Sequence, residues 1–96
     1  MSPEGTVALQ RAVEAALRDV IDPEIGGSIV DIGLVYGVVG MDGVIRVTMT
    51  TTSRGCPATG FLVDAVRERV LATGLAEKVE VVLTYDPPWS PSMMRN

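Results

Sequence analysis

The sequence contains a single cysteine, Cys56, and the residues on both sides of it shape the backbone. Gly55 permits backbone angles that other residues avoid, and Pro57 is a preferred first residue of a helix. Cys56 is therefore predicted to be the N-cap of a helix, where the helix dipole and the positive charge of Arg54 favour a thiolate. A partly exposed thiolate there could bind a soft metal or act as a nucleophile. The alternative is that Cys56 fills a small apolar space under the helix, as free cysteines commonly do.

Hydroxyl and carboxylate side chains could accompany this thiol. The hydroxyls directly precede Cys56 and could bond an anion, or could satisfy the backbone of their own loop; they are Thr50, Thr51, Thr52 and Ser53. The carboxylates belong to the first long loop and could provide oxygen ligands or hydrogen-bond acceptors; they are Asp22, Glu24 and Asp31. Asp22 and Glu24 are also interpreted as a helix stop on a solvated turn. Asp31, between two apolar residues, is expected to bond backbone amides.

Composition excludes several functional classes. Histidine is absent, which removes any Cys-His or Ser-His dyad. A formal charge of −4 opposes binding to nucleic acid phosphates. One cysteine forms no disulfide within the chain, which agrees with a reducing compartment. The apolar runs are short and residues 1–7 lack the features of a secretory signal, so we expect a cytoplasmic protein without a membrane span.

Two helices are predicted from apolar residues that recur at intervals of three and four. The first covers Thr6–Val20 and ends at Asp22 and Pro23, because a residue before proline avoids helical angles. The second covers Pro57–Thr73 and is closed by Gly74 as a C-terminal cap. Its apolar stripe consists of Phe61, Leu62, Ala65, Val66 and Val70.

Three strands are predicted from β-branched residues and alternating polarity. Leu34–Val39 and Val44–Thr50 flank a tight reversal at residues 40–43 and form a hairpin. Lys78–Tyr85 forms the third. The residues predicted to face the core are Ile45, Val47 and Met49 in the second strand and Val79, Val81, Leu83 and Tyr85 in the third.

The predicted fold class is a two-layer α/β (α+β) domain with the order helix, strand, strand, helix, strand. Two helices pack on one face of a small three-stranded mixed sheet, and a crossover between parallel strands is right-handed. Residues 1–96 form one domain, with residues 1–5 and 92–96 expected to be mobile. The strand order remains open at this level.

Trp89 follows Pro87 and Pro88, which restrict the direction of its ring. Two interpretations are equally favoured: the ring closes the core, or it anchors a protein partner.

Four segments, in this order, resemble one known family. They are Asp22-Pro23-Glu24-Ile25, Ile29 to Tyr36, Met49-Thr50 through Gly55-Cys56-Pro57-Ala58-Thr59-Gly60, and Asp86-Pro87-Pro88-Trp89. The chain resembles the SufT and PaaD-like family of iron-sulfur cluster assembly domains, which includes the eukaryotic cytosolic iron-sulfur targeting subunit. PaaD itself carries a cysteine-rich C-terminal extension that is not seen here, so the SufT-like form is the closer match.

The resemblance implies a factor that assembles iron-sulfur clusters or transfers them to client proteins. It also implies that Cys56 is the functional thiol and metal ligand, that Thr52 and Asp31 lie around it as cofactor-binding residues, and that Trp89 borders this face. The implied partners are iron-sulfur assembly proteins and apo client proteins.

A cluster needs about four thiolate or equivalent ligands, and this chain offers one. Cys56 either bridges a cluster across a homodimer or transiently contacts a cluster held by a partner, so no cluster is tightly bound by one chain. The outer face of the sheet, with Val44 and Val82, is a possible dimer surface. The alternative is an adaptor that docks clients without binding a cluster. No catalytic residue is expected, and a thiol-dependent enzyme ranks last because no histidine can activate Cys56.

Overall fold

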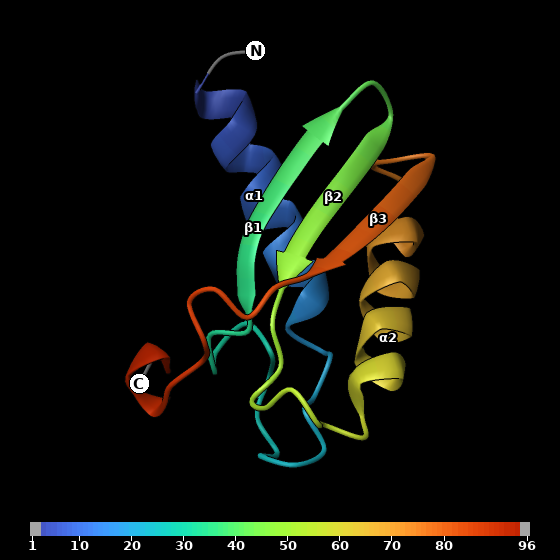
Figure 1. Ribbon diagram of the computed structural model, residues 1–96. Helices are drawn as coiled ribbons and strands as arrows, with labels where there is room; N and C mark the ends of the chain where they lie inside the picture. The colour runs from blue at the N-terminus through green and yellow to red at the C-terminus, as the bar shows by residue number, and fades with distance from the viewer. Residues whose placement is uncertain (1–2, 95–96) are drawn as a thin grey trace.

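The computed structural model describes residues 3–94 and has two layers, a three-stranded sheet and two helices that cover one of its faces (Figure 1). The elements are α1 (Pro3–Leu17), β1 (Val35–Met41), β2 (Val44–Met49), α2 (Thr59–Ala72), β3 (Lys78–Leu83) and a 3₁₀ turn, η1 (Pro91–Met93). The predicted fold class and the predicted order of helices and strands are confirmed.

The sheet has the order β1-β2-β3, with β2 in the centre. β1 and β2 form an antiparallel hairpin, and β2 runs parallel to β3 with α2 as the crossover between them. The hairpin turn consists of two residues, Asp42 and Gly43, whose φ angles are 53° and 79°. Positive φ at both positions is the requirement of a type I′ turn, and an Asp-Gly pair meets it well.

The core lies between the sheet and the two helices. β2 directs Ile45, Val47 and Met49 into it, as the alternation predicts, while Arg46 is exposed on the opposite face. The helical residues that complete this core are Val13 and Leu17 from α1 and Leu62, Val66 and Val70 from α2.

The first helix differs from its prediction at both ends. It begins at Pro3 and ends at Leu17, before the predicted stop at Asp22 and Pro23. After Leu17 the backbone tightens, because the Val20 amide donates to the Leu17 carbonyl over 3.0 Å. Val20 is still buried in the core, which explains why its apolar character extended the helical pattern too far.

Two predicted core residues lie at the surface. Phe61 is 62% exposed, because the stripe that packs on the sheet has a spacing of four, through Leu62, Val66 and Val70. Leu83 is 38% exposed at the last position of the edge strand β3. Tyr85 follows this strand and is partly buried.

At both ends of the described chain, residues expected to be mobile belong to helical elements, and their mobility stays a prediction. Residues 3–5 belong to α1, and residues 91–93 form η1 against the start of β1. Tyr36 donates its hydroxyl to the Pro87 carbonyl over 2.8 Å, and a Cβ on Gly33 would lie 2.5 Å from the Met93 carbonyl oxygen. The mobility predicted for residues 1–2 and 95–96 falls outside the described residues.

Candidate functional site

The loop that carries Cys56 spans residues 50–58, between β2 and α2, and lies at the same end of the sheet as the loop between α1 and β1 (Figure 1). A hydrogen bond joins the two loops, since the Thr52 hydroxyl donates to a Glu24 carboxylate oxygen over 3.3 Å. The buried polar side chains that the structure describes all belong to these loops: Asp22, Ser28, Thr50 and Thr51. Among the described residues, buried polar side chains are therefore found at this end of the molecule, whereas the core between sheet and helices is apolar.

Cys56 is not the N-cap of α2, contrary to the prediction. The helix begins at Thr59, and its N-cap is Ala58, without a side-chain hydrogen bond. The reason is a separate turn, in which Thr59 bonds the Cys56 carbonyl through its amide over 3.2 Å and its hydroxyl over 2.8 Å. The helix dipole acts mainly within the first turn, and Cys56 lies outside that turn.

The Cys56 side chain is more buried than expected. Only 6% of the residue is exposed, so the prediction of a partly exposed sulfur is wrong. Cys56 is nevertheless not a member of the apolar core cluster, and its chain neighbours Arg54, Gly55 and Pro57 are all exposed. Cys56 is thus a buried residue of a loop whose neighbouring residues are exposed, and it lies outside the apolar core cluster.

The hydroxyls before Cys56 mainly bond within the protein. Thr50 donates to the Thr51 carbonyl over 3.3 Å, and Thr51 donates to the Ser53 carbonyl over 2.6 Å. These bonds satisfy loop backbone, which is the second of the two interpretations that the sequence allowed. Thr52, predicted to bind the cofactor, is partly exposed beside Glu24, and its ligand role remains a prediction.

Asp22 lies in a different environment from the one that its sequence position predicts. It is fully buried, at 0% exposure, rather than on a solvated turn. One carboxylate oxygen, Oδ1, accepts the Glu24 amide over 2.8 Å, while Oδ2 has no hydrogen-bond partner. Proteins rarely leave a buried carboxylate oxygen unpaired, so Oδ2 is available as an acceptor for an incoming group. The Asp-Pro-Glu sequence indicates the turn at this position but not its burial.

Asp31 does not bond backbone amides as expected. Its carboxylate lies 3.3 Å from the Arg18 guanidinium in a half-exposed ion pair. Exposed pairs of this kind contribute little to stability. The arrangement links the end of α1 to the long loop, and the predicted cofactor-binding role of Asp31 remains a prediction.

Trp89 packs against the core and is partly buried. Its indole N–H donates to the Ile32 carbonyl over 2.6 Å. These contacts support the interpretation that the ring closes the core, while its predicted role as a partner anchor stays untested. Trp89 ties the C-terminal segment to the loop that contains Asp31.

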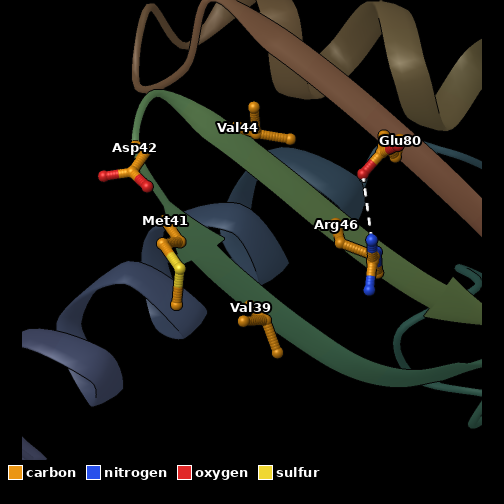
Figure 2. Close-up of a pocket in the computed structure, with 6 residues that line it drawn as sticks. All are labelled: Val39, Met41, Asp42, Val44, Arg46 and Glu80. Carbon is orange, nitrogen blue, oxygen red and sulfur yellow. Dashed lines mark hydrogen bonds and ion pairs between the residues drawn. The ribbon is translucent and has the colours of Figure 1, made fainter.

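A separate hollow of about 320 Å³ lies on the outer face of the sheet, where the side chains point away from the helices (Figure 2). Val39 and Met41 are 60% and 67% exposed beside it. Arg46 of β2 and Glu80 of β3 form an ion pair at 3.3 Å at one side of the hollow (Figure 2). Exposed apolar groups next to balanced charges are features that protein interfaces share.

The described residues do not form a complete metal site. No group of three or more His, Cys, Asp or Glu residues within positions 3–94 is placed to hold a metal ion. A cluster that reached Cys56 would need ligands from another molecule. Within the same positions, no helix has the length and apolar character required to cross a membrane.

A family model described as iron-sulfur cluster assembly protein matches residues 10–83. This range contains both loops of the candidate site, with Asp22, Thr52 and Cys56. The match agrees with the resemblance that the four sequence segments indicated.

Two bacterial relatives and one solved structure are similar over most of the chain. A Porphyromonas gingivalis Fe-S protein maturation auxiliary factor is 44% identical over 81% of this chain and 75% of its own length. The Staphylococcus aureus Fe-S protein maturation auxiliary factor SufT is 43% identical over 78% of this chain and 86% of its own. The crystal structure of a Bacillus anthracis domain of unknown function, DUF59, has a TM-score of 0.89 and 36% identity, covering 97% of this chain and 90% of its own.

Proposed function

This chain belongs to the family of iron-sulfur cluster assembly proteins and has the SufT-like form, and from that membership we propose that Cys56 is the thiol through which it acts. Its role is the assembly or maturation of iron-sulfur proteins, as the names of its relatives indicate. The cluster is cargo in this proposal, and clients and assembly proteins are the partners. A cytoplasmic location and the absence of catalysis remain part of the proposal.

The observation that carries the proposal is the position of Cys56 at the polar loop end of the domain. Cys56 is buried between exposed residues of this loop and lies outside the apolar core cluster. A structural cysteine would be expected among the core side chains, where it behaves as a small apolar group. A thiol beneath a polar loop can instead be uncovered by a local movement.

One thiolate cannot hold a cluster unaided, and this deficit suits transfer. Iron-sulfur clusters take about four cysteine or equivalent ligands. The remaining ligands would come from a client, an assembly protein or a second copy of this chain. Few ligands from the carrier leave the cluster labile, so a client with a complete ligand set can remove it.

Asp22 is proposed to assist Cys56. Its unpaired Oδ2 can accept a hydrogen bond from a group that enters between the two loops, or can provide an oxygen ligand to iron. Burial strengthens such a bond, because competing water is excluded. Thr52, bonded to Glu24 at the junction of the loops, is proposed to line the same entry.

Anaerobic reconstitution with iron and sulfide in the presence of a small thiol tests the role of Cys56. We expect visible charge-transfer absorption for the wild type and its loss in Cys56→Ser, because the thiolate ligand is removed. Ser53→Ala is the matched control, since Ser53 is an exposed residue of the same loop. A chromophore that persists unchanged in Cys56→Ser would show that Cys56 is not a ligand.

The stoichiometry of the reconstituted species separates the two ligand arrangements. A bridged cluster predicts one cluster for two chains and elution as a dimer. Such a dimer would have to form at the loop end of the domain, because the outer hollow lies near the opposite, hairpin end of β2 (Figure 2). A cluster delivered by a partner predicts a monomer that acquires the chromophore only when a loaded donor protein is added.

The adaptor alternative is tested by client capture. If the domain docks clients without touching their clusters, Cys56→Ser retains both client binding and client maturation. Trp89→Phe replaces the indole with a smaller phenyl ring and removes the N–H bond to Ile32, and would weaken capture in the adaptor case. Loss of maturation with retained capture in Cys56→Ser supports the thiol mechanism.

A further inference from the structure

Tyr85 contacts the loop that carries Cys56 at two points, although it lies 29 residues further along the chain. Its hydroxyl is 2.8 Å from the Thr51 hydroxyl. The guanidinium carbon of Arg54 lies 4.9 Å from the centre of its ring, which is a cation–π contact. Thr51 is near the start of the loop, and Arg54 is two residues before Cys56.

The direction of the Tyr85 hydrogen bond follows from counting protons. A hydroxyl carries one proton, and Thr51 donates its own to the Ser53 carbonyl over 2.6 Å. Tyr85 must therefore be the donor to Thr51. The phenol acts as an anchor with a defined orientation.

The same Ser53 carbonyl also accepts the backbone amide of Cys56, over 3.3 Å. A continuous chain of hydrogen bonds therefore runs from the Tyr85 hydroxyl through the Thr51 hydroxyl and the Ser53 carbonyl to the Cys56 amide. The phenol donates to the Thr51 hydroxyl, which polarises that hydroxyl as a donor to the Ser53 carbonyl. Tyr85 thereby helps to hold in place the carbonyl oxygen that the Cys56 amide also uses.

We propose that Tyr85 is a positioning residue for Cys56 and that it holds the 50–58 loop closed over the thiol. Because only 6% of Cys56 is exposed, a reagent or a cluster can reach the sulfur only when the structure around it opens, and the sulfur belongs to this loop. The phenol bond and the Arg54 contact both oppose that opening. This inference rests on the proposed function for its biological meaning, but access to the thiol can be measured without iron or clients.

The experiment measures alkylation of Cys56 by iodoacetamide in the purified full chain. In Tyr85→Phe the ring and its Arg54 contact remain while the hydrogen bond is lost. We expect alkylation about 2- to 10-fold faster, as the loss of one neutral hydrogen bond implies. Arg54→Ala should give an increase of about 2- to 5-fold, as the loss of an exposed cation–π contact implies. Rates are compared at the alkaline plateau of the pH profile, so that access is separated from thiol acidity.

Tyr36→Phe is the matched control. Tyr36 donates its hydroxyl to the Pro87 carbonyl over 2.8 Å and lies 3.6 Å from the Met93 sulfur, and neither partner belongs to the 50–58 loop. Both variants remove one phenol hydrogen bond, so similar losses of global stability are expected. Only Tyr85→Phe should accelerate alkylation.

Low concentrations of urea distinguish local opening from global unfolding. Local opening exposes little surface, so its rate of alkylation should be nearly independent of urea. The proposal is overturned if Tyr85→Phe reacts at the wild-type rate, if Tyr36→Phe accelerates the reaction equally, or if the acceleration follows urea as global unfolding does. If Tyr85→Phe accelerates alkylation but the wild type forms no cluster on reconstitution, the positioning role of Tyr85 stands and the metal role of Cys56 is rejected.

Discussion

β2 is connected at its two ends in contrasting ways. At its start, the exposed residues Asp42 and Gly43 reverse the chain through their own backbone angles. After its end, residues 50–58 leave the sheet as a longer loop that buries polar side chains and bonds to distant parts of the chain. The turn is a local structure, whereas the loop depends on the rest of the fold. This difference explains why chemistry is expected at one end and not at the other.

Thr51→Val, at the loop end of β2, is expected to cause the largest loss of stability. The substitution keeps the side-chain volume but removes the hydroxyl that joins Tyr85 to the Ser53 carbonyl. The Tyr85 hydroxyl then lacks its acceptor and the Ser53 carbonyl keeps only the Cys56 amide, which should lower the free energy of unfolding by about 1–3 kcal/mol and accelerate alkylation of Cys56. Thr48→Val on the outer face of β2 is the control, with a change within about 0.5 kcal/mol. Urea denaturation measures the free energy of unfolding of both variants. If Thr51→Val and Thr48→Val lower it equally, the side-chain hydrogen bonds of the loop do not stabilise the fold.

An intermediate effect is expected from Gly43→Ala at the turn. Gly43 has a φ of 79°, while its added Cβ would meet Glu77 only at 3.6 Å, an ordinary contact. Backbone strain alone should lower stability by about 1 kcal/mol. Alkylation of Cys56 should keep the wild-type rate under native conditions. An accelerated reaction in this variant would mean that the two ends of β2 are coupled.

The smallest effect on stability is expected from Asp22→Asn, and its direction is informative. The amide oxygen can keep the bond to the Glu24 amide, while the unpaired Oδ2 is replaced by a neutral group that is easier to bury. We expect stability to rise by up to about 1 kcal/mol and cluster reconstitution to weaken, the trade-off that functional polar groups show. Lower stability with normal reconstitution would assign Asp22 a purely structural role. Thermal unfolding and visible absorption provide the two measurements.

Much of the fold could be predicted because it depends on local patterns. Alternation in β2 predicted its buried residues, and the Asp-Gly turn predicted the hairpin. The end of α1 could not be predicted, because Val20 belongs to the apolar pattern but is buried from a turn. Phe61 was misplaced because hydrophobicity does not reveal which side of a helix meets the sheet.

The candidate site was only partly predictable. The sequence identified Cys56 and its loop, since one cysteine between glycine and proline is conspicuous. It did not reveal that Asp22 is buried with one unpaired oxygen, or that Tyr85 bonds the loop. Both facts depend on contacts between residues far apart in the chain, which no local pattern encodes.

By itself, the sequence determined the element types, the hairpin, the buried face of β2 and the family resemblance, because these follow from side-chain period, turn chemistry and residue identity. Only the tertiary structure decided the strand order, the burial of Cys56 and the partners of Asp22, Thr51 and Tyr85. The physical reason is that burial and hydrogen bonding in loops are set by whichever distant segments pack against them. Such packing exists only once the whole chain has folded.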